Sequence, residues 1–202
     1  MATELTWLGH ASFRVDTPGG KRIYVDPWLN GNPKCPESEL EPERCDLILL
    51  THGHGDHVGD TVAIHERFGC SVVALLELRG WLEGKGVEAN AAHGPNKGGT
   101  VGWEGVKATL TDANHSSSTP DGAYAGEPTG IVLEVEDGFK IYFAGDTNVS
   151  ATCPSSAASI HPTSPCFRSE TTTRWDHVKQ PSRSSYSASS ASSRAITGRS
   201  GS

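Results

Sequence analysis

The sequence predicts an α/β sandwich. Within the first three quarters of the chain, strand patterns occur at both ends, and strand–helix units lie between them. The continuous apolar run within residues 46–51 is typical of a strand that is covered on both faces. The pair Asp137-Gly138, between two further apolar runs, predicts a hairpin. With 202 residues, 23 glycines and 12 prolines, the chain fits one turn-rich domain, or one such domain with a tail.

The individual elements follow from alternation, β-forming residues and turn signals. Pro18-Gly19-Gly20 places a turn between the second and third strands. The expected elements, in chain order, are strands at 4–8, 12–16, 22–25 and 46–51, a helix at 58–68, a strand at 71–75, a helix at 76–84, and strands at 106–112, 130–136 and 139–144.

Charge and composition limit the kinds of partner that the protein is expected to bind. Residues 1–149 contain 22 Asp and Glu against 11 Lys and Arg, a balance of −11, whereas residues 150–202 have a balance of +4. The acidic first part argues against nucleic acid as the main partner. Neither a signal-peptide pattern nor an apolar segment of membrane-spanning length occurs, so we expect a cytoplasmic protein with no membrane partner. Five scattered cysteines, an odd number, favour reduced thiols over a disulfide framework.

The segment 51–57, Thr-His-Gly-His-Gly-Asp-His, is the strongest functional signal. Its HxHxDH motif puts His52, His54, Asp56 and His57 directly after a buried strand. Imidazole nitrogen is a common ligand of zinc and similar cations, and a carboxylate adds the negative charge that holds a second one. The intervening glycines let the backbone bend until the side chains converge. A His-rich surface loop is the alternative, but the pattern favours a metal site.

Three residues elsewhere extend this predicted site. His115 follows the strand at 106–112 and can point into the same cleft. Asp146 closes the strand at 139–144, although a carboxylate there could also cap a turn. Asp26, which precedes a proline, is expected to orient a ligand histidine without binding metal itself.

The remaining histidines and tryptophans receive structural interpretations. His10 either lines the cleft or bonds the backbone to fix a turn at Gly9, and the structural role is favoured. His65 and His93 are interpreted as surface residues. Trp7, Trp28, Trp81 and Trp103 are interpreted as core or pocket-wall aromatics.

Several short motifs occur together in one order: WLGHAS at 7–12, DPWL at 26–29 with NP at 32–33, THGHGDH at 51–57, NHS at 114–116 and FAGDT at 143–147. Through them, residues 1–149 resemble the metallo-β-lactamase superfamily, in particular its branch of small metal-dependent hydrolases related to ascorbate-6-phosphate lactonase. The resemblance implies a metallo-β-lactamase-like αββα sandwich whose C-terminal half is incomplete here. It also implies two divalent metal ions, with zinc expected and manganese or iron as alternatives.

The resemblance further implies a ligand set in two halves that share one carboxylate. In this family a last histidine, in a motif close to HYGTF, is expected to complete the second metal site. No such motif occurs here, and this ligand role is not transferred to His161 or His177. The implied ligands are His52, His54 and His115 for one metal, Asp56 and His57 for the second, and Asp146 as a bridge between both.

The chain changes character after Val149. Residues 1–149 are interpreted as the N-terminal part of a metallo-β-lactamase-like domain, and residues 150–202 as a Ser-rich tail, with ten serines among residues 181–202. Such composition is typical of disorder. A competing hypothesis is that one nucleotide is missing just after the Val149 codon: with synonymous codons, the shifted frame can be read as strings that include GDHYTMGP and HYGTF. Under either hypothesis the tail forms little stable structure.

Three hypotheses about function follow from these patterns. The first is a metal-dependent hydrolase that uses a metal-bound hydroxide on a small ester, lactone or phosphorylated substrate, with Asp56 as the catalytic residue that orients the nucleophile or accepts its proton. The second is an iron-dependent redox enzyme on the same fold. The third is an inactive product that lacks one ligand and the C-terminal layer. The expected partner is a small-molecule substrate; the oligomeric state is open, a homo-oligomer included.

Overall fold

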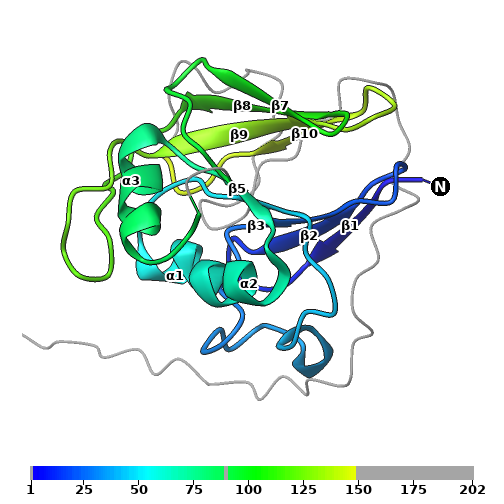
Figure 1. The fold of residues 1–202 in the computed structure, drawn as a ribbon, viewed down its shortest axis with the longest axis horizontal. Coiled ribbons are helices and arrows are strands. Elements are labelled where there is room, and N and C mark those ends of the chain that lie inside the picture. The colour runs from blue at the N-terminus through cyan, green and yellow to red at the C-terminus, as the bar shows by residue number, and fades with distance from the viewer. Residues whose placement is uncertain (1, 89–90, 149–202) are drawn as a thin grey trace, which may run out of the picture.

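The computed structural model describes residues 2–88 and 91–148. In this part of the chain two β-sheets pack face to face, and helices cover the outer side of the larger sheet (Figure 1). The predictions made for residues 150–202, including the Ser-rich tail and the shifted reading frame, lie outside the described residues. Three of the cysteines lie within them, and Cys35, Cys45 and Cys70 are free thiols as predicted.

The larger sheet has six strands in the order β1-β2-β3-β4-β5-β6. The first three are antiparallel, and the pairs from β3 to β6 are parallel. This change of direction marks where hairpins give way to strand–helix units. The strands are β1 (Glu4–Trp7), β2 (Phe13–Asp16), β3 (Arg22–Val25), β4 (Leu47–Leu49), β5 (Ser71–Val73) and β6 (Ala92–His93).

The smaller sheet is antiparallel throughout, in the order β10-β9-β8-β7. The predicted hairpin at Asp137-Gly138 is confirmed, because β9 and β10 pair directly and Gly138 has the positive φ of 83° that this turn requires. The strands are β7 (Thr100–Trp103), β8 (Val106–Asp112), β9 (Thr129–Glu134) and β10 (Lys140–Phe143).

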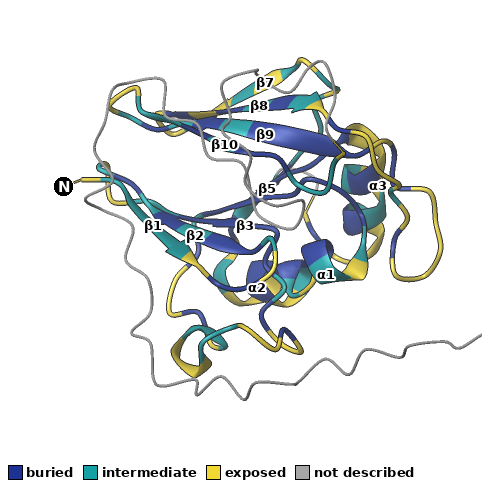
Figure 2. Ribbon diagram, turned by 180° about the vertical axis from the view of Figure 1, so that it is seen from behind, coloured by how far each residue is buried: buried dark blue, intermediate teal, exposed yellow. Residues whose placement is uncertain are grey.

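Two hydrophobic layers hold this arrangement together. Ile23, Leu49 and Phe143 belong to the layer between the sheets. In Figure 2 the strands on both sides of this layer include many buried residues, drawn in dark blue. Ile48 and Leu82 belong to the layer between the larger sheet and its helices. Alternate residues of β4 thus enter different layers, as the predicted two-faced burial requires. The helices are α1 (Gly55–Val58), α2 (Thr61–Phe68) and α3 (Leu76–Gly84), and a 3₁₀ turn, η1, covers Glu37–Glu39.

The described part of the chain is therefore an α/β fold of three layers. Its helices all pack on the larger sheet, so the helical layer expected on the other side of the smaller sheet is not among residues 2–88 and 91–148. Within the same residues, no helix has both the length and the apolar character to cross a bilayer.

The single helix predicted at 58–68 is wrong in one respect, since α1 and α2 are separate helices. Gly59 divides them with a φ of 34°. A Cβ atom there would lie 2.5 Å from the Cα of Trp28 and 2.6 Å from the carbonyl oxygen of Pro27. The close approach of two backbones therefore excludes any side chain at this position, which periodicity alone does not reveal.

Two strands were missed in the sequence. β6 has only two residues, and β7 is an edge strand whose residues alternate between exposed and half-buried. Trp103 of β7 packs against the core between the sheets, and its ring N–H donates to Ser71 Oγ at 3.0 Å. The glycines of residues 94–102 concealed this strand, because glycine weakens a strand pattern.

The Gly59→Ala substitution should destabilise the protein through this backbone contact. Gly69→Ala is the matched control: Gly69 also has a positive φ, 63°, but its Cβ would meet nothing within 4 Å. We expect Gly69→Ala to lower the free energy of unfolding by about 1 kcal/mol and Gly59→Ala by about 2–4 kcal/mol, measured by urea denaturation. Equal losses in the two variants would contradict this account.

Candidate metal centre

Five strands lead into the candidate site from the same edge of the structure. β1, β3 and β4 share one direction, because β2 is antiparallel to both of its neighbours and β3 is parallel to β4. β8 and β10 share a direction because each is antiparallel to β9. The residues that follow these strands are His10, Asp26, the 51–57 segment, His115 and Asp146.

The two sheets are joined at this edge by contacts to Thr51. The backbone N–H and the hydroxyl of Thr129 both donate to the Thr51 carbonyl at 2.9 Å. Gly145 lies against the Thr51 side chain so closely that a Cβ would be 2.8 Å away. On the smaller sheet, Asn114 N–H donates to Thr147 Oγ1 at 2.9 Å. These contacts hold the loops that carry His115 and Asp146 against the 51–57 segment.

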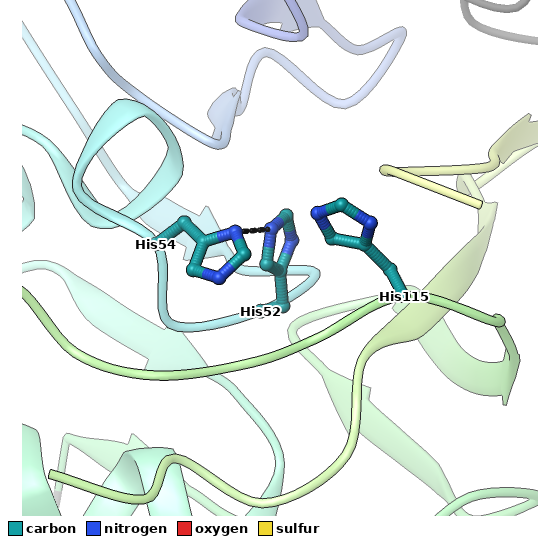
Figure 3. Close-up of side chains that lie close together, drawn as sticks. All are labelled: His52, His54 and His115. Atoms are coloured by element: carbon teal, nitrogen blue, oxygen red, sulfur yellow. Dashed lines mark hydrogen bonds between the residues drawn. The ribbon is translucent and has the colours of Figure 1, made fainter. Parts of the chain in front are cut away.

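The first candidate ligand group is made of His52, His54 and His115, whose ligand nitrogens lie within 4.8 Å of one another (Figure 3). His52 Nε2 is 3.0 Å from His54 Nδ1, and the ring of His115 stands edge-on to both others. His52 is buried, whereas His115 is exposed. The group therefore spans from the protein interior to the surface, and the sequence placed all three residues in it.

The second candidate group is made of His10, His57 and Asp146, again within 4.8 Å of one another. His57 Nε2 lies 3.6 Å from Asp146 Oδ2 and 3.3 Å from His10 Nε2. Asp146 Oδ2 is also 3.5 Å from His115 Nε2, so its carboxylate stands between the two groups. Asp56 lies beside the second group, with Oδ2 3.2 Å from His10 Nε2 and a half-exposed side chain.

Asp26 hydrogen-bonds to a histidine of the second group, as its predicted orienting role requires. Its buried carboxylate lies 2.8 Å from His57 Nδ1 and accepts hydrogen bonds from the Thr51 backbone N–H at 2.8 Å and the Thr51 hydroxyl at 2.6 Å. Because β3 and β4 are parallel neighbours, Asp26 and Thr51 come together where both strands end. His57 must donate through Nδ1, which leaves Nε2 facing the second group.

The same carboxylate also fixes His52, through the Thr51 hydroxyl. The single hydroxyl proton goes to Asp26, so Thr51 Oγ1 accepts from His52 Nδ1 at 3.0 Å. His52 therefore presents the lone pair of Nε2 to the first group. His54 can present Nδ1 while its Nε2 faces Ser116 Oγ at 3.3 Å. Hydrogen bonding thus orients His52 and His54 in the first group and His57 in the second.

The histidines differ in charge state according to their surroundings. Burial lowers the pKa of His52 to about 3, so this ring is neutral and ready to act as a ligand. Burial would also lower the pKa of His57, but the Asp26 and Asp146 carboxylates outweigh it and raise that pKa to about 10. The hydrogen bond to His57 in turn holds the pKa of Asp146 well below its usual range.

Some predictions for neighbouring residues are wrong. His65 is buried, not on the surface: its Nδ1 lies 2.7 Å from the Cys70 carbonyl, and Nε2 accepts from Glu88 N–H. By contrast, His93 in β6 is half-buried, which does not contradict its predicted surface position. Trp7 is exposed and not a core residue, although its ring N–H donates to the His10 carbonyl.

His10 belongs to the site, where the sequence favoured a purely structural role. Its position after β1, at the edge where β3 and β4 also end, was the available signal. Trp28, interpreted as core or pocket wall, stands edge-on to the His10 ring at 5.6 Å between centroids and so borders the site.

The described fold is a two-sheet α/β domain with two groups of histidine and carboxylate side chains at one edge. These features define a candidate metalloprotein with the metallo-β-lactamase fold. The sequence profile of the Beta-lactamase superfamily domain matches residues 21–175. The chain belongs to this family, as its motifs predicted.

Relatives agree with this assignment. The chain is 50% identical over 151 residues to a "UPF0173 metal-dependent hydrolase" of Herpetosiphon aurantiacus, covering 73% of this chain and 63% of the relative. A protein of the same description from Rubrobacter xylanophilus is 47% identical, over 73% of this chain and 62% of its own length. The chain thus spans about 63% of the length of the curated relatives it matches.

Solved structures resemble the described fold. Igni18, a metallo hydrolase from the archaeon Ignicoccus hospitalis, superposes with a TM-score of 0.63 at 33% identity, over 74% of this chain and 63% of that one. CmlA, a diiron β-hydroxylase from Streptomyces venezuelae, superposes with a TM-score of 0.56 at 22% identity, over 75% of this chain and 31% of its own. The second likeness supports the fold alone.

The Asp26→Asn substitution should weaken metal binding at the second group, because an amide replaces the carboxylate that orients His57. We expect the affinity of that group for Zn²⁺ to fall by about 10–100-fold, measured by competition with a chromophoric chelator. Asp16→Asn is the control. Asp16 forms ion pairs with Arg14 and Arg22 and lies at the end of β2 that is farther from the candidate site. Unchanged affinity in Asp26→Asn would refute the orienting role.

Zn²⁺ binding at the second group should release a proton from His57, whose raised pKa of about 10 keeps the ring protonated near neutral pH in the metal-free protein. Affinity should therefore rise with pH up to that pKa, by at most about tenfold per unit. Calorimetric titration in two buffers of different protonation enthalpy measures the released proton. His57→Gln should abolish this release; release that persists in the variant would contradict the assignment.

Proposed function

We propose that this protein is a metal-dependent hydrolase that acts on a small ester, lactone or phosphorylated substrate. The observation that carries the proposal is the meeting of two candidate ligand groups, with Asp146 between them, at one edge of the fold. The description of the curated relatives as metal-dependent hydrolases supports the same function. The substrate class is inferred from the family resemblance, since fold alone does not define chemistry.

The donor set fits divalent metal ions. Two nitrogens bound to one tetrahedral zinc ion lie roughly 3.3 Å apart, given zinc–nitrogen bonds of about 2.05 Å. The nitrogens of the first group already lie within 4.8 Å of one another, and His52 is neutral there. The second group combines imidazole with carboxylate, a set that zinc, manganese and iron all accept. We propose two ions, with zinc as the first choice.

The residues around these groups have separate tasks in the proposed reaction. Bound divalent cations would polarise the substrate oxygen and lower the pKa of a coordinated water molecule. The half-exposed Asp56 carboxylate can accept the proton of the attacking water. Asp146 supplies negative charge to both ligand groups, and Trp28 borders the space beside His10.

His115→Ala should abolish hydrolysis by the purified full chain, because it removes one nitrogen of the first group from an exposed position whose loss leaves the core intact. We expect turnover to fall more than about 100-fold, with stability nearly unchanged. The assay screens lactones, phosphodiesters and thioesters with zinc, manganese or iron added, after bound metals have been measured. His93→Ala, a histidine outside both groups, is the control.

The same measurements separate the alternatives. Iron as the native metal, with no esterase or lactonase turnover, would favour a redox enzyme on this fold. Metal binding without turnover on any substrate would favour an inactive product. Full activity in His115→Ala would show that the first group takes no part in the reaction.

A further inference from the structure

His10 lies in a tight, strained turn that follows β1. Leu8 N–H donates to the Ser12 carbonyl, and Ser12 N–H donates to the Gly9 carbonyl, both at 2.9 Å. His10 has a φ of 49°, in the left-handed region that residues other than glycine seldom adopt. Such strain persists only where the surroundings impose it, and it is often found at functional sites.

The surroundings impose it through contacts on both sides of the turn. A Cβ on Gly9 would lie 2.7 Å from the Cβ of Lys34 and 2.8 Å from Asn32 Oδ1, so no side chain fits before His10. Trp7 Nε1 donates to the His10 carbonyl at 2.9 Å. The position of the His10 backbone is therefore fixed.

The turn is also tied to the residue that orients His57. Ser12 Oγ donates to the backbone carbonyl of Asp26 at 2.6 Å and is itself buried. The carboxylate of Asp26 in turn holds His57 Nδ1 at 2.8 Å. A short path of hydrogen bonds thus links the turn that carries His10 to the ring of His57.

The ring nitrogens that result face each other. His10 Nε2 lies 3.3 Å from His57 Nε2, with 72° between the ring planes, and 3.2 Å from Asp56 Oδ2. Asp146 Oδ2 also lies 3.6 Å from His57 Nε2. Two imidazole nitrogens and two carboxylates converge on one small space, an arrangement that a bound cation stabilises.

We propose that Nε2 of His10 is a ligand of the cation at the second group, together with His57 and Asp146. The inference rests on the proposed two-metal function and deepens it. His10 lies outside the residues 21–175 that match the family profile, so the match assigns it no role. The competing arrangement, an ion pair of His10 with Asp56 that serves only proton transfer, is an outcome of the test.

The test compares His10→Asn with the unchanged full chain. Asparagine tolerates a positive φ, so this variant removes the imidazole ring and preserves the turn. His10→Ala also removes the ring, but alanine is strained at a positive φ. Zn²⁺ is titrated against a chromophoric chelator, and Co²⁺ is then bound and its visible absorption recorded. His93→Ala is the control for removal of a histidine outside the site.

We expect two Zn²⁺ affinities in the unchanged chain. In both His10 variants one of these affinities should fall at least tenfold while the other stays the same, and the Co²⁺ absorption of the second ion should change. Unchanged affinities and an unchanged Co²⁺ spectrum in His10→Asn would overturn the ligand role, and a simultaneous loss of turnover would assign His10 to proton transfer.

The proposed function has a separate control in His52→Ala. If that variant keeps both Zn²⁺ affinities, the metal centre itself is refuted. If it loses one affinity while His10→Asn loses none, only the role of His10 is refuted.

Discussion

The candidate site depends on one buried carboxylate. Asp26 faces three groups, the backbone N–H and hydroxyl of Thr51 and Nδ1 of His57, and its exposed fraction is 1%. A buried charge is costly unless hydrogen bonds compensate it, and these three do. Through them Asp26 determines which nitrogen His57 and, by way of Thr51, His52 present to the site. One residue therefore orients a candidate ligand in each group.

This dependence explains why the site lies between two sheets. Parallel strands end at a common edge, so β3 and β4 bring Asp26 beside Thr51 without a long connection. The smaller sheet then closes on the same residue, through hydrogen bonds from Thr129 and the close contact of Gly145. Each group takes candidate ligands from both sheets, so the geometry within each group depends on the packing of the apolar layer that separates the sheets.

Most elements and most candidate ligands could be predicted, because their signals are local. Apolar runs and turn pairs revealed eight of the described strands, and the HxHxDH motif located four side chains within six residues. The errors share another cause. The break at Gly59 arises from the backbone of residues 27–28, the burial of His65 from its contact with Cys70, and the inclusion of His10 from His57. Each partner lies too far along the chain, or on too different an element, for periodicity to show it.

The sequence by itself determined the kinds of candidate ligand, the strands that carry them and the carboxylate beside them, since residue type and short-range spacing encode these. Only the tertiary structure decided which ring nitrogen faces which group, that Asp56 lies beside His10, and that His10 approaches His57 across 47 positions of the chain. The reason is physical: a hydrogen-bond direction and a distance of a few ångströms depend on how separate elements pack, and no local pattern records that packing.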